Sequence, residues 1–243
     1  MNIVGMSNVG AVRGENQDDF AYKQLSDTDG FALVCDGMGG ANGGSVASHI
    51  ATKLIASRIV SSYRPEMTGA SVENMLESAV AAANIEIFDT ADKDPTLKGM
   101  GTTVVAAVWI HGEAHIVHVG DSRAYLYHDG RLTQLTCDHS YVQDMVDKGQ
   151  LTPEQARSDP RKHIITRALG VDDSIQVDFD TIPLTDTGDL LLLCSDGLTN
   201  MVEPDSIQHF IETTPFTQLP QVLIDAANEN GGADNITVVA AIQ

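Results

Sequence analysis

Residues 102–135 read TTVVAAVWIHGEAHIVHVGDSRAYLYHDGRLTQL, the part of the chain most informative about fold class. Apolar and β-branched residues divide it into short strands separated by turn residues. The expected strands are Thr102–Ile110, Ala114–Val119, Ala124–His128 and Arg131–Leu135. Gly112 and Asp129-Gly130 lie in turns, and connections this short join antiparallel neighbours. The stretch therefore predicts an antiparallel meander rather than a parallel sheet.

Strands and helices also follow one another in groups on both sides of this meander. Further strands are expected at Ile3–Val9, Phe20–Gln24, Phe31–Cys35, Gln176–Thr181, Leu190–Cys194 and Asn235–Ile242. Helical spacing of apolar residues predicts helices at about Gly44–Ser61, Val72–Thr90, Asp205–Glu212 and Leu219–Glu229. We predict an α+β fold in which two stacked antiparallel sheets are flanked by pairs of helices. A mixed sheet with helices on one face is the alternative.

The 243 residues contain no Pro/Gly/Ser-rich linker, so we expect one domain over residues 1–243. The stretch from about Asp138 to Gly170 breaks the strand rhythm and forms a small helical insertion. It contains two short helical stretches, Ser140–Lys148 and Thr152–Ser158. Thr152-Pro153 starts the second, with Thr as the N-cap and Pro at the first helical position.

Composition excludes several classes of function. The formal net charge of −20 repels nucleic acid and anionic membranes, so we expect neither as a partner. The longest apolar runs, Val104–Ile110 and Leu190–Cys194, are too short to span a bilayer. Three widely spaced cysteines are typical of reduced thiols, which together with the absence of a signal-peptide pattern favours a cytoplasmic location.

Four aspartates follow or precede apolar strands and stand beside small residues: Asp36, Asp121, Asp196 and Asp234. A carboxylate at the end of a core strand is costly unless its charge is met. Convergence of these side chains would suit a hard divalent ion such as Mg²⁺ or Mn²⁺. Asp-Gly is also an ordinary turn signal, and spacing alone leaves both readings open.

An arginine precedes the first of these aspartates, in the stretch Arg13 to Asp18. Beside a metal cluster, the planar guanidinium of Arg13 would hold a phosphate with two hydrogen bonds. By itself, a lone arginine is more often a surface charge.

Five blocks of the chain resemble, in order, the metal-dependent serine/threonine protein phosphatases of type 2C. The blocks are Arg13 to Asp18, Asp36 to Gly44, Gly99 to Thr103, Gly120 to Arg123, and Ser195-Asp196-Gly197 with Asp234-Asn235. The insertion at 138–170 resembles the flap subdomain of bacterial stand-alone members. The resemblance covers nearly the whole chain and implies a sandwich of two antiparallel sheets between helices.

The resemblance also implies a binuclear Mn²⁺ or Mg²⁺ centre. By position, Asp36 bridges two ions and Gly37 offers its backbone carbonyl to one of them. Asp196 and Asp234 complete the site, and Asp121 joins Asp196 in holding a possible third, weaker ion.

The remaining implied roles concern the substrate and the water. Arg13 is expected to hold the substrate phosphate, and Asp18 to bond water on the metals. Two ions sharing a water lower its pKa, so that it attacks phosphorus and the serine or threonine oxygen leaves. No protein nucleophile is needed, so we reject Cys35 and Cys194 in that role.

Three positions depart from the family pattern. Gln17 stands where some members have a glutamate ligand. Met38 and Ala41 stand where certain members have a histidine that could protonate the leaving group. We therefore take water on the metal as the proton donor, as a hypothesis.

The resemblance implies phosphorylated proteins as substrates, a cognate serine/threonine kinase as opponent, and a monomer. Three other functions are weighed against it. They are a phosphatase dedicated to one regulatory phosphoprotein, a catalytically inactive binding module, and a metal-dependent nuclease, which the acidic charge disfavours.

Overall fold

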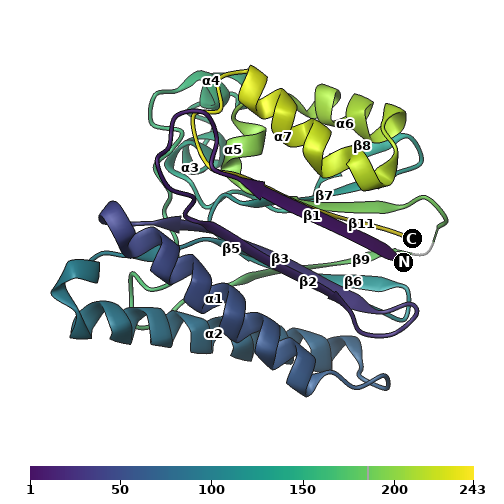
Figure 1. Ribbon diagram of the computed structural model, residues 1–243, viewed down its shortest axis with the longest axis horizontal. Coiled ribbons are helices and arrows are strands. Elements are labelled where there is room, and N and C mark those ends of the chain that lie inside the picture. The colour runs from purple at the N-terminus through teal and green to yellow at the C-terminus, as the bar shows by residue number, and fades with distance from the viewer. Residues whose placement is uncertain (185) are drawn as a thin grey trace.

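The computed structural model describes residues 1–184 and 186–243, and of residues 40–42 it describes only the backbone. Two antiparallel sheets lie face to face (Figure 1). The first sheet has the order β1 (Asn2–Asn8), β11 (Ile236–Ile242), β10 (Leu190–Cys194), β7 (Arg123–His128) and β8 (Arg131–Gln134). The second has the order β2 (Asp18–Gln24), β3 (Gly30–Met38), β5 (Val104–Ile110), β6 (Glu113–Val119) and β9 (Asp178–Pro183), with β4 (Gly101–Thr102) paired to β3.

Each sheet is covered on its outer face by two helices. In Figure 1, α1 (Gly40–Ser62) and α2 (Gly69–Lys93) cover the second sheet, and α6 (Pro204–Thr213) and α7 (Leu219–Glu229) cover the first. Short 3₁₀ turns at Pro95–Leu97 and Phe216–Gln218 precede β4 and α7. The predicted fold class is confirmed, and the alternative of a mixed sheet covered on one face is wrong.

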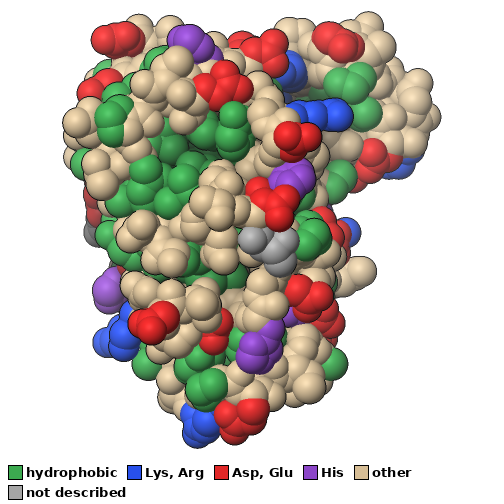
Figure 2. Space-filling model, turned by 90° about the vertical axis from the view of Figure 1, so that its right-hand side faces the viewer, with side chains coloured by type: hydrophobic (Ala, Val, Ile, Leu, Met, Phe, Trp, Pro, Cys, Tyr) green, Lys and Arg blue, Asp and Glu red, His purple; other side chains and the backbone are tan. Residues whose placement is uncertain are grey.

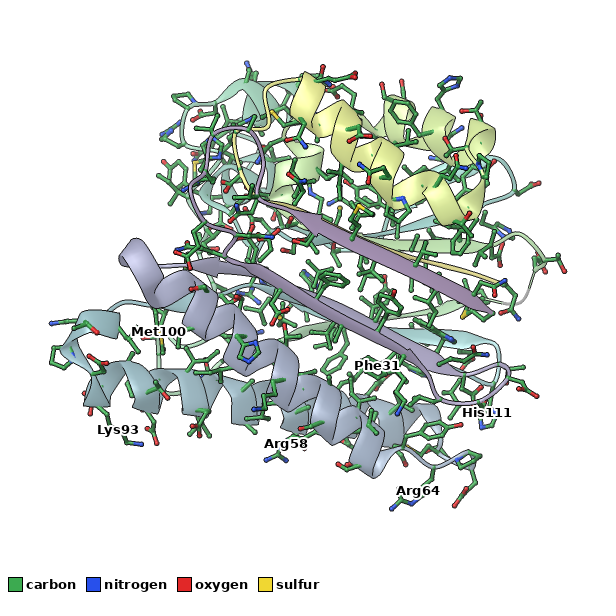
Figure 3. The ribbon with its side chains drawn as sticks, in the orientation of Figure 1. Phe31, Arg58, Arg64, Lys93, Met100 and His111 are labelled. Atoms are coloured by element: carbon green, nitrogen blue, oxygen red, sulfur yellow. The ribbon has the colours of Figure 1, made fainter. Side chains whose placement is uncertain are left out.

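Apolar side chains fill three layers. Alanines such as Ala32, Ala107 and Ala241 are fully or almost fully buried between the sheets, where small side chains allow close approach. Larger residues fill the space under the helices, among them Phe31, which lies between β3 and α1 in Figure 3. Arg58, on the same helix pair, points away from the sheets in that view. Burial of each large apolar side chain contributes about 1.5–3 kcal/mol.

The first helix begins earlier than the sequence predicts, at Gly40 rather than about Gly44. Its N-cap is Gly39, which has a φ of 113° and no side chain to cap the helix. The N-cap signals used for sequence prediction are therefore missing here. By contrast, Thr68 caps α2 by accepting a hydrogen bond from the Ser71 N–H group.

The expected strand Thr102–Ile110 is two strands, because the chain leaves the ladder at Thr103. The Thr103 N–H group donates to the Asp36 carbonyl (2.9 Å), and the Asp36 N–H group donates to Thr103 Oγ1 (3.0 Å). The four-residue helix α5 (Asp196–Thr199) was also not expected. Both differences from the sequence prediction lie beside aspartates: the interruption at Thr103 contacts Asp36, and α5 begins at Asp196.

The flap, residues 138–170, contains the two predicted helices, α3 (Tyr141–Asp147) and α4 (Pro153–Ser158). Ser140 caps α3, and Thr152 forms a capping box with Gln155 at the start of α4. β-bridges join Ser140 to Ile165 and Thr102 to Leu169, so both ends of the flap are tied together and to the sheet.

Surface composition agrees with the sequence charge. On the end of the molecule shown in Figure 2, acidic side chains outnumber Lys and Arg. Within the described residues, no helix combines the length and apolar character that a membrane crossing requires.

Candidate metal centre

All five aspartates singled out by the sequence gather at one end of the sandwich. Two belong to the paired strands β2 and β3, one follows β6, one opens α5, and one precedes β11. We call this group the carboxylate cluster: Asp18, Asp36, Asp121, Asp196 and Asp234. Four of them line a cleft of about 490 Å³ together with Arg13 and Gly37, whereas Asp18 is buried and does not line it.

Asp36 is the centre of this cluster. It lies opposite Asp18 in the β2–β3 ladder and is partly open to the cleft. Desolvation by the surrounding protein is the largest cause that raises its pKa well above the usual value, and the charges of the other four carboxylates raise it further. Such mutual repulsion indicates that the cluster needs a cation.

Asp18 is buried and links the two sheets. Ser195 and Thr237 donate their hydroxyl hydrogens to Asp18 Oδ2, each at 2.7 Å. Burial nevertheless raises the pKa of Asp18 to about 7, since it outweighs these two hydrogen bonds. The other oxygen, Oδ1, is buried and finds no hydrogen-bond partner among the described residues.

Asp196 also has a buried carboxylate oxygen without a hydrogen-bond partner among the described residues. Asn200 Nδ2 donates to Asp196 Oδ2 (2.8 Å), while Oδ1 is buried without a partner among the described residues. Burial and then the charge of Asp234 raise the pKa of Asp196. Unpartnered carboxylate oxygens are costly in a protein interior. Because they are also the preferred ligands of Mg²⁺ and Mn²⁺, the donor set fits such ions.

Asp121 follows a turn at Gly120. Gly120 has a φ of 105°, and a Cβ there would approach Thr103 Cγ2 to 2.6 Å, so glycine is required. Asp121 is buried, and its pKa is raised well above the usual value, first by burial and then by the charge of Asp196.

Gly37 also has no room for a side chain. A Cβ would lie 2.1 Å from the Gly44 carbonyl oxygen and 2.5 Å from that of Gln17. Its N–H group donates to the Gln17 carbonyl (3.1 Å). Backbone of three segments therefore packs closely beside Asp36, on the wall of the cleft.

Arg13 reaches the cleft from the loop between β1 and β2. Its guanidinium donates to Asp234 Oδ2 at 2.8 Å, and this hydrogen bond is the main cause that raises the pKa of Arg13. The side chain is 53% exposed, and its other N–H groups make no hydrogen bond with the described residues. These N–H groups are available to an anion in the cleft.

Asn235 organises the backbone around the cluster and was not singled out as a site residue. Its Oδ1 accepts from the Gln17 N–H group (2.8 Å), and its Nδ2 donates to the carbonyls of Val9 and Glu15, each at 2.9 Å. Ser195 and Thr237 were missed in the same way. The only sequence signal of Ser195 is that it precedes Asp196, and that of Thr237 is that it lies in a predicted strand.

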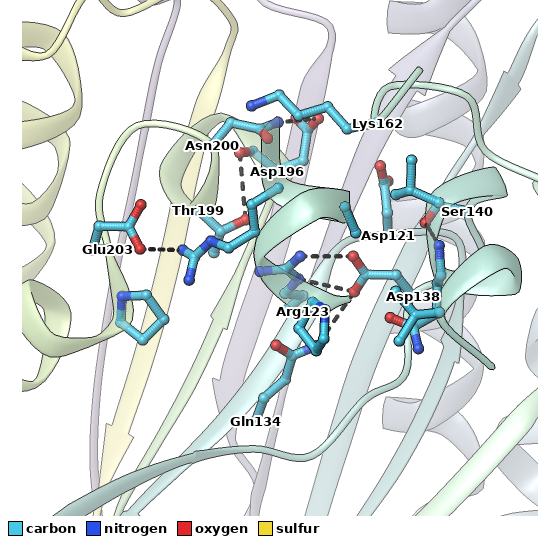
Figure 4. Close-up of a pocket in the computed structure, with 17 residues that line it drawn as sticks. Asp121, Arg123, Gln134, Asp138, Ser140, Lys162, Asp196, Thr199, Asn200 and Glu203 are labelled. Atoms are coloured by element: carbon cyan, nitrogen blue, oxygen red, sulfur yellow. Dashed lines mark hydrogen bonds and ion pairs between the residues drawn. The ribbon is translucent and has the colours of Figure 1, made fainter. Parts of the chain in front are cut away.

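A second cavity, of about 310 Å³, adjoins the cleft under the flap (Figure 4). Asp121, Asp196 and Asn200 line both spaces. At its wall, Arg123 donates two hydrogen bonds to Asp138 (2.8 and 2.7 Å). An ion pair of 2.5 Å between Arg157 and Glu203 ties the flap to the residue preceding α6.

The three residues that depart from the family pattern, Gln17, Met38 and Ala41, differ in how they relate to the cleft. The Gln17 backbone contacts Gly37, and Met38 lines the cleft, whereas the side chain of Ala41 lies outside the described residues. His163, from the flap, also lines the cleft.

The cysteines are unsuited to nucleophilic chemistry. Cys35 and Cys194 lie buried in β3 and β10, and burial raises the pKa of each thiol to about 12. Cys137 is exposed and outside the cleft.

The chain resembles known proteins over nearly its whole length. Residues 11–232 match the family model described as protein phosphatase 2C. The chain is 39% identical over 231 residues to the serine/threonine phosphatase stp of Listeria monocytogenes, covering 95% of this chain and 91% of that one. It is 36% identical to the protein phosphatase PhpP of Streptococcus pneumoniae, covering 98% and 96%.

Solved structures show the same fold. The S. agalactiae serine/threonine phosphatase superposes with a TM-score of 0.91 at 32% identity, covering 100% of this chain and 99% of that one. The catalytic domain of the phosphatase PstP, solved in complex with two manganese ions, has a TM-score of 0.86 at 34% identity, covering 99% and 97%.

Proposed function

Because this chain belongs to the protein phosphatase 2C family, it is a metal-dependent serine/threonine protein phosphatase, and we propose that the carboxylate cluster is its catalytic centre. In this proposal Asp36, the backbone carbonyl of Gly37, Asp196 and Asp234 would hold two Mn²⁺ or Mg²⁺ ions. Asp121 and Asp196 would hold a third ion. The observation that carries the proposal is the convergence of four carboxylates on one cleft, where a buried oxygen of Asp196 has no partner among the described residues.

Ions bound there supply positive charge to the phosphoryl oxygens and lower the pKa of water. The residues of this chain then orient the reactants. Arg13 holds the substrate phosphate with the guanidinium N–H groups that Asp234 does not use. Asp18, held by Ser195 and Thr237, presents its free oxygen Oδ1 as a hydrogen-bond acceptor for water.

The substrates are proteins phosphorylated on serine or threonine. We propose that a cognate serine/threonine kinase opposes the enzyme, that it acts as a cytoplasmic monomer, and that solvent at the centre protonates the leaving oxygen. We also propose that residues 1–243 form one catalytic domain, with the flap at 138–170. The sheet topology supports a single domain, because each sheet combines strands from distant parts of the chain.

The direct test is hydrolysis of a phosphothreonine peptide with Mn²⁺ present or chelated, comparing the wild type with Asp36→Ala. We expect metal-dependent turnover that the variant loses. Turnover that survives in Asp36→Ala would contradict the proposed centre. Metal binding without turnover in the wild type, across a panel of phosphopeptides, would favour a binding module or a phosphatase for one regulatory protein.

A further inference from the structure

His139, at the base of the flap, uses both of its ring nitrogens. The side chain is only 6% exposed. Nδ1 lies 3.1 Å from the backbone nitrogen of Gly120, and Nε2 lies 3.0 Å from Asp178 Oδ2. The ring thus joins the start of the flap to β9 and to the turn that precedes Asp121.

The backbone and the neighbouring side chains strengthen this junction. The His139 N–H group donates to the Gly120 carbonyl (2.9 Å), and the Thr166 N–H group donates to the His139 carbonyl (2.8 Å). Arg167 donates to the other oxygen of Asp178 (2.9 Å). The His118 ring stacks on His139 at 4.7 Å. Both ends of the flap therefore meet at His139.

These partners determine the protonation of the ring. A backbone N–H group can only donate, so Nδ1 of His139 must carry no proton. The carboxylate of Asp178 accepts, so Nε2 must carry the proton. Burial lowers the pKa of His139, which agrees with a neutral ring. The group His118, His139 and Asp178 is compact enough to hold a metal ion. However, both nitrogens of His139 and Nε2 of His118 are already engaged, the latter with the Cys137 carbonyl (2.8 Å).

We propose that His139 is a positioning residue, which holds the Gly120 turn and thereby directs Asp121 toward the metal cluster. The turn itself is tightly constrained, since Gly120 has a positive φ and packs against Thr103. Asp178 and Arg167 act by holding the His139 ring in one tautomer. The inference rests on the proposed role of Asp121 in binding a third ion.

Two substitutions of His139 separate its two contacts. In His139→Asn, the amide oxygen can take the place of Nδ1 and accept from Gly120, but the side chain is too short to reach Asp178. In His139→Gln, the side chain can reach Asp178 but cannot accept from Gly120. Thermal unfolding of both variants checks that they fold.

The measurement is Mn²⁺ titration followed by the EPR signal of free Mn²⁺, with Asp121→Asn as reference. We expect His139→Gln to bind the weakest ion roughly tenfold less tightly, the lower end of what supporting residues contribute at metal sites. His139→Asn should stay within about threefold of the wild type, as rescue by the retained hydrogen bond predicts.

A third variant leaves His139 in place. Asp178 is 40% exposed, so Asp178→Asn removes no core residue. Arg167 requires the amide oxygen, which turns the amide NH₂ group toward Nε2 of His139. The ring should then change to the Nδ1–H tautomer, in which two N–H groups face each other at Gly120. We expect weak Mn²⁺ binding similar to that of His139→Gln.

¹⁵N NMR of the imidazole in the metal-free protein reports this tautomer directly. We expect Nε2–H in the wild type, and Nδ1–H there would overturn the inference. Weaker binding in Asp121→Asn but unchanged binding in folded His139→Gln would also overturn it, leaving the proposed centre intact. If Asp121→Asn itself binds Mn²⁺ as the wild type does, the proposed third site is wrong, and the inference is wrong with it.

Discussion

Arg13 carries a fixed positive charge at the rim of an otherwise acidic cleft. One of its nitrogens bonds Asp234, and the rest of its planar donor group faces no described partner. A lysine would keep the charge but lose the geometry that matches two phosphate oxygens.

We therefore expect Arg13→Lys to lower kcat/KM for a phosphothreonine peptide by roughly 10- to 100-fold, as the loss of a charge-assisted hydrogen bond does. Steady-state kinetics measure this, and Mn²⁺ affinity should change little. Arg64→Lys is the control, because Arg64 bonds only the carbonyls of Ser61 and Tyr63 among the described residues. Equal kcat/KM in wild type and Arg13→Lys would exclude the proposed phosphate contact.

His163 lines the cleft, so it is the histidine to test as a proton donor. If solvent protonates the leaving oxygen, His163→Asn should keep kcat within about threefold and retain the acidic limb of the pH–rate profile. Exposed His209, which lies outside the cleft, provides the matched control His209→Asn. Disappearance of an acidic limb near pH 6.5 only in His163→Asn would identify this imidazole as the acid.

At the scale of elements, the flap is attached to the rest of the molecule at its base and by the ion pair between Arg157 and Glu203. Ser140 and Ile165 form a β-bridge, and the Tyr141 N–H group donates to the Ile164 carbonyl (2.8 Å). The base also contains buried Leu169. Deletion of all of 138–170 would therefore damage the core, whereas removal of 142–163 preserves the base.

With 142–163 replaced by two glycines, we expect activity on a phosphoprotein to fall much more than activity on a small aryl phosphate. Both activities are compared with those of His163→Asn, because the removed segment includes that cleft residue. The reason is that α3 and α4 line the cavity beside the cleft but not the phosphate position. Arg157→Ala, which breaks the ion pair with Glu203, should act in the same direction, and Arg161→Ala, whose ion pair with Asp159 stays within the flap, is its control. Equal losses on both substrates would rule out a role in substrate selection.

The end of β7 is connected to the loop before β10 by His128. Its Nδ1 lies 2.7 Å from Asp189 Oδ1, and this hydrogen bond is the main cause that raises the pKa of His128. A histidine whose pKa is higher in the folded state stabilises the fold below the ordinary pKa of about 6.5. That stabilisation is lost as the pH rises through the folded value.

Urea unfolding should therefore show wild type more stable than His128→Gln at pH 6, with a difference that shrinks by pH 8.5. His209→Gln is the matched control, since His209 is exposed and has no carboxylate partner among the described residues. A difference for His128→Gln that grows with pH would mean that the folded-state pKa is lowered instead.

At the scale of the whole molecule, the cluster joins two independent layers. Asp18 and Asp36 belong to the second sheet, and Asp121 lies in the connection from β6 of that sheet to β7 of the first. Asp196 and Asp234 adjoin β10 and β11 of the first sheet. Without a cation, folding brings these like charges together against their mutual repulsion. A bound ion should therefore stabilise the sandwich as well as the site.

We expect Mn²⁺ at one hundred times its Kd to raise the free energy of unfolding by about 2.7 kcal/mol relative to chelated protein. Asp36→Asn removes one of the repelling charges, so in EDTA it should exceed the chelated wild type by roughly 1–3 kcal/mol. It should also lose most of the response to Mn²⁺. Urea unfolding with EDTA or Mn²⁺ measures both, and a less stable Asp36→Asn in EDTA would show that Asp36 is not electrostatically strained.

The sequence by itself determined the layers and the acidic residues of this protein. Apolar and β-branched runs separated by short turns predict the strands from β5 to β8, and the Thr152-Pro153 start signal predicts α4, because these features depend on neighbours in the chain. The ordered aspartate blocks predict the residues that gather in the cluster. Their roles as ligands stay predictions.

Only the tertiary structure decided how those carboxylates are held. Asp18 bonds Ser195 and Thr237, which lie more than 170 residues away, and no local pattern encodes such contacts. The start of α1 at Gly40 and the four-residue α5 lie where backbone segments pack closely, since a Cβ would come within 2.6 Å of the Gly99 carbonyl oxygen at Gly39 and within 2.0 Å of the Asn235 carbonyl oxygen at Gly197. His139 has no periodicity that reveals its partners. Its role arises because the fold brings a flap end, a strand and a turn to one imidazole.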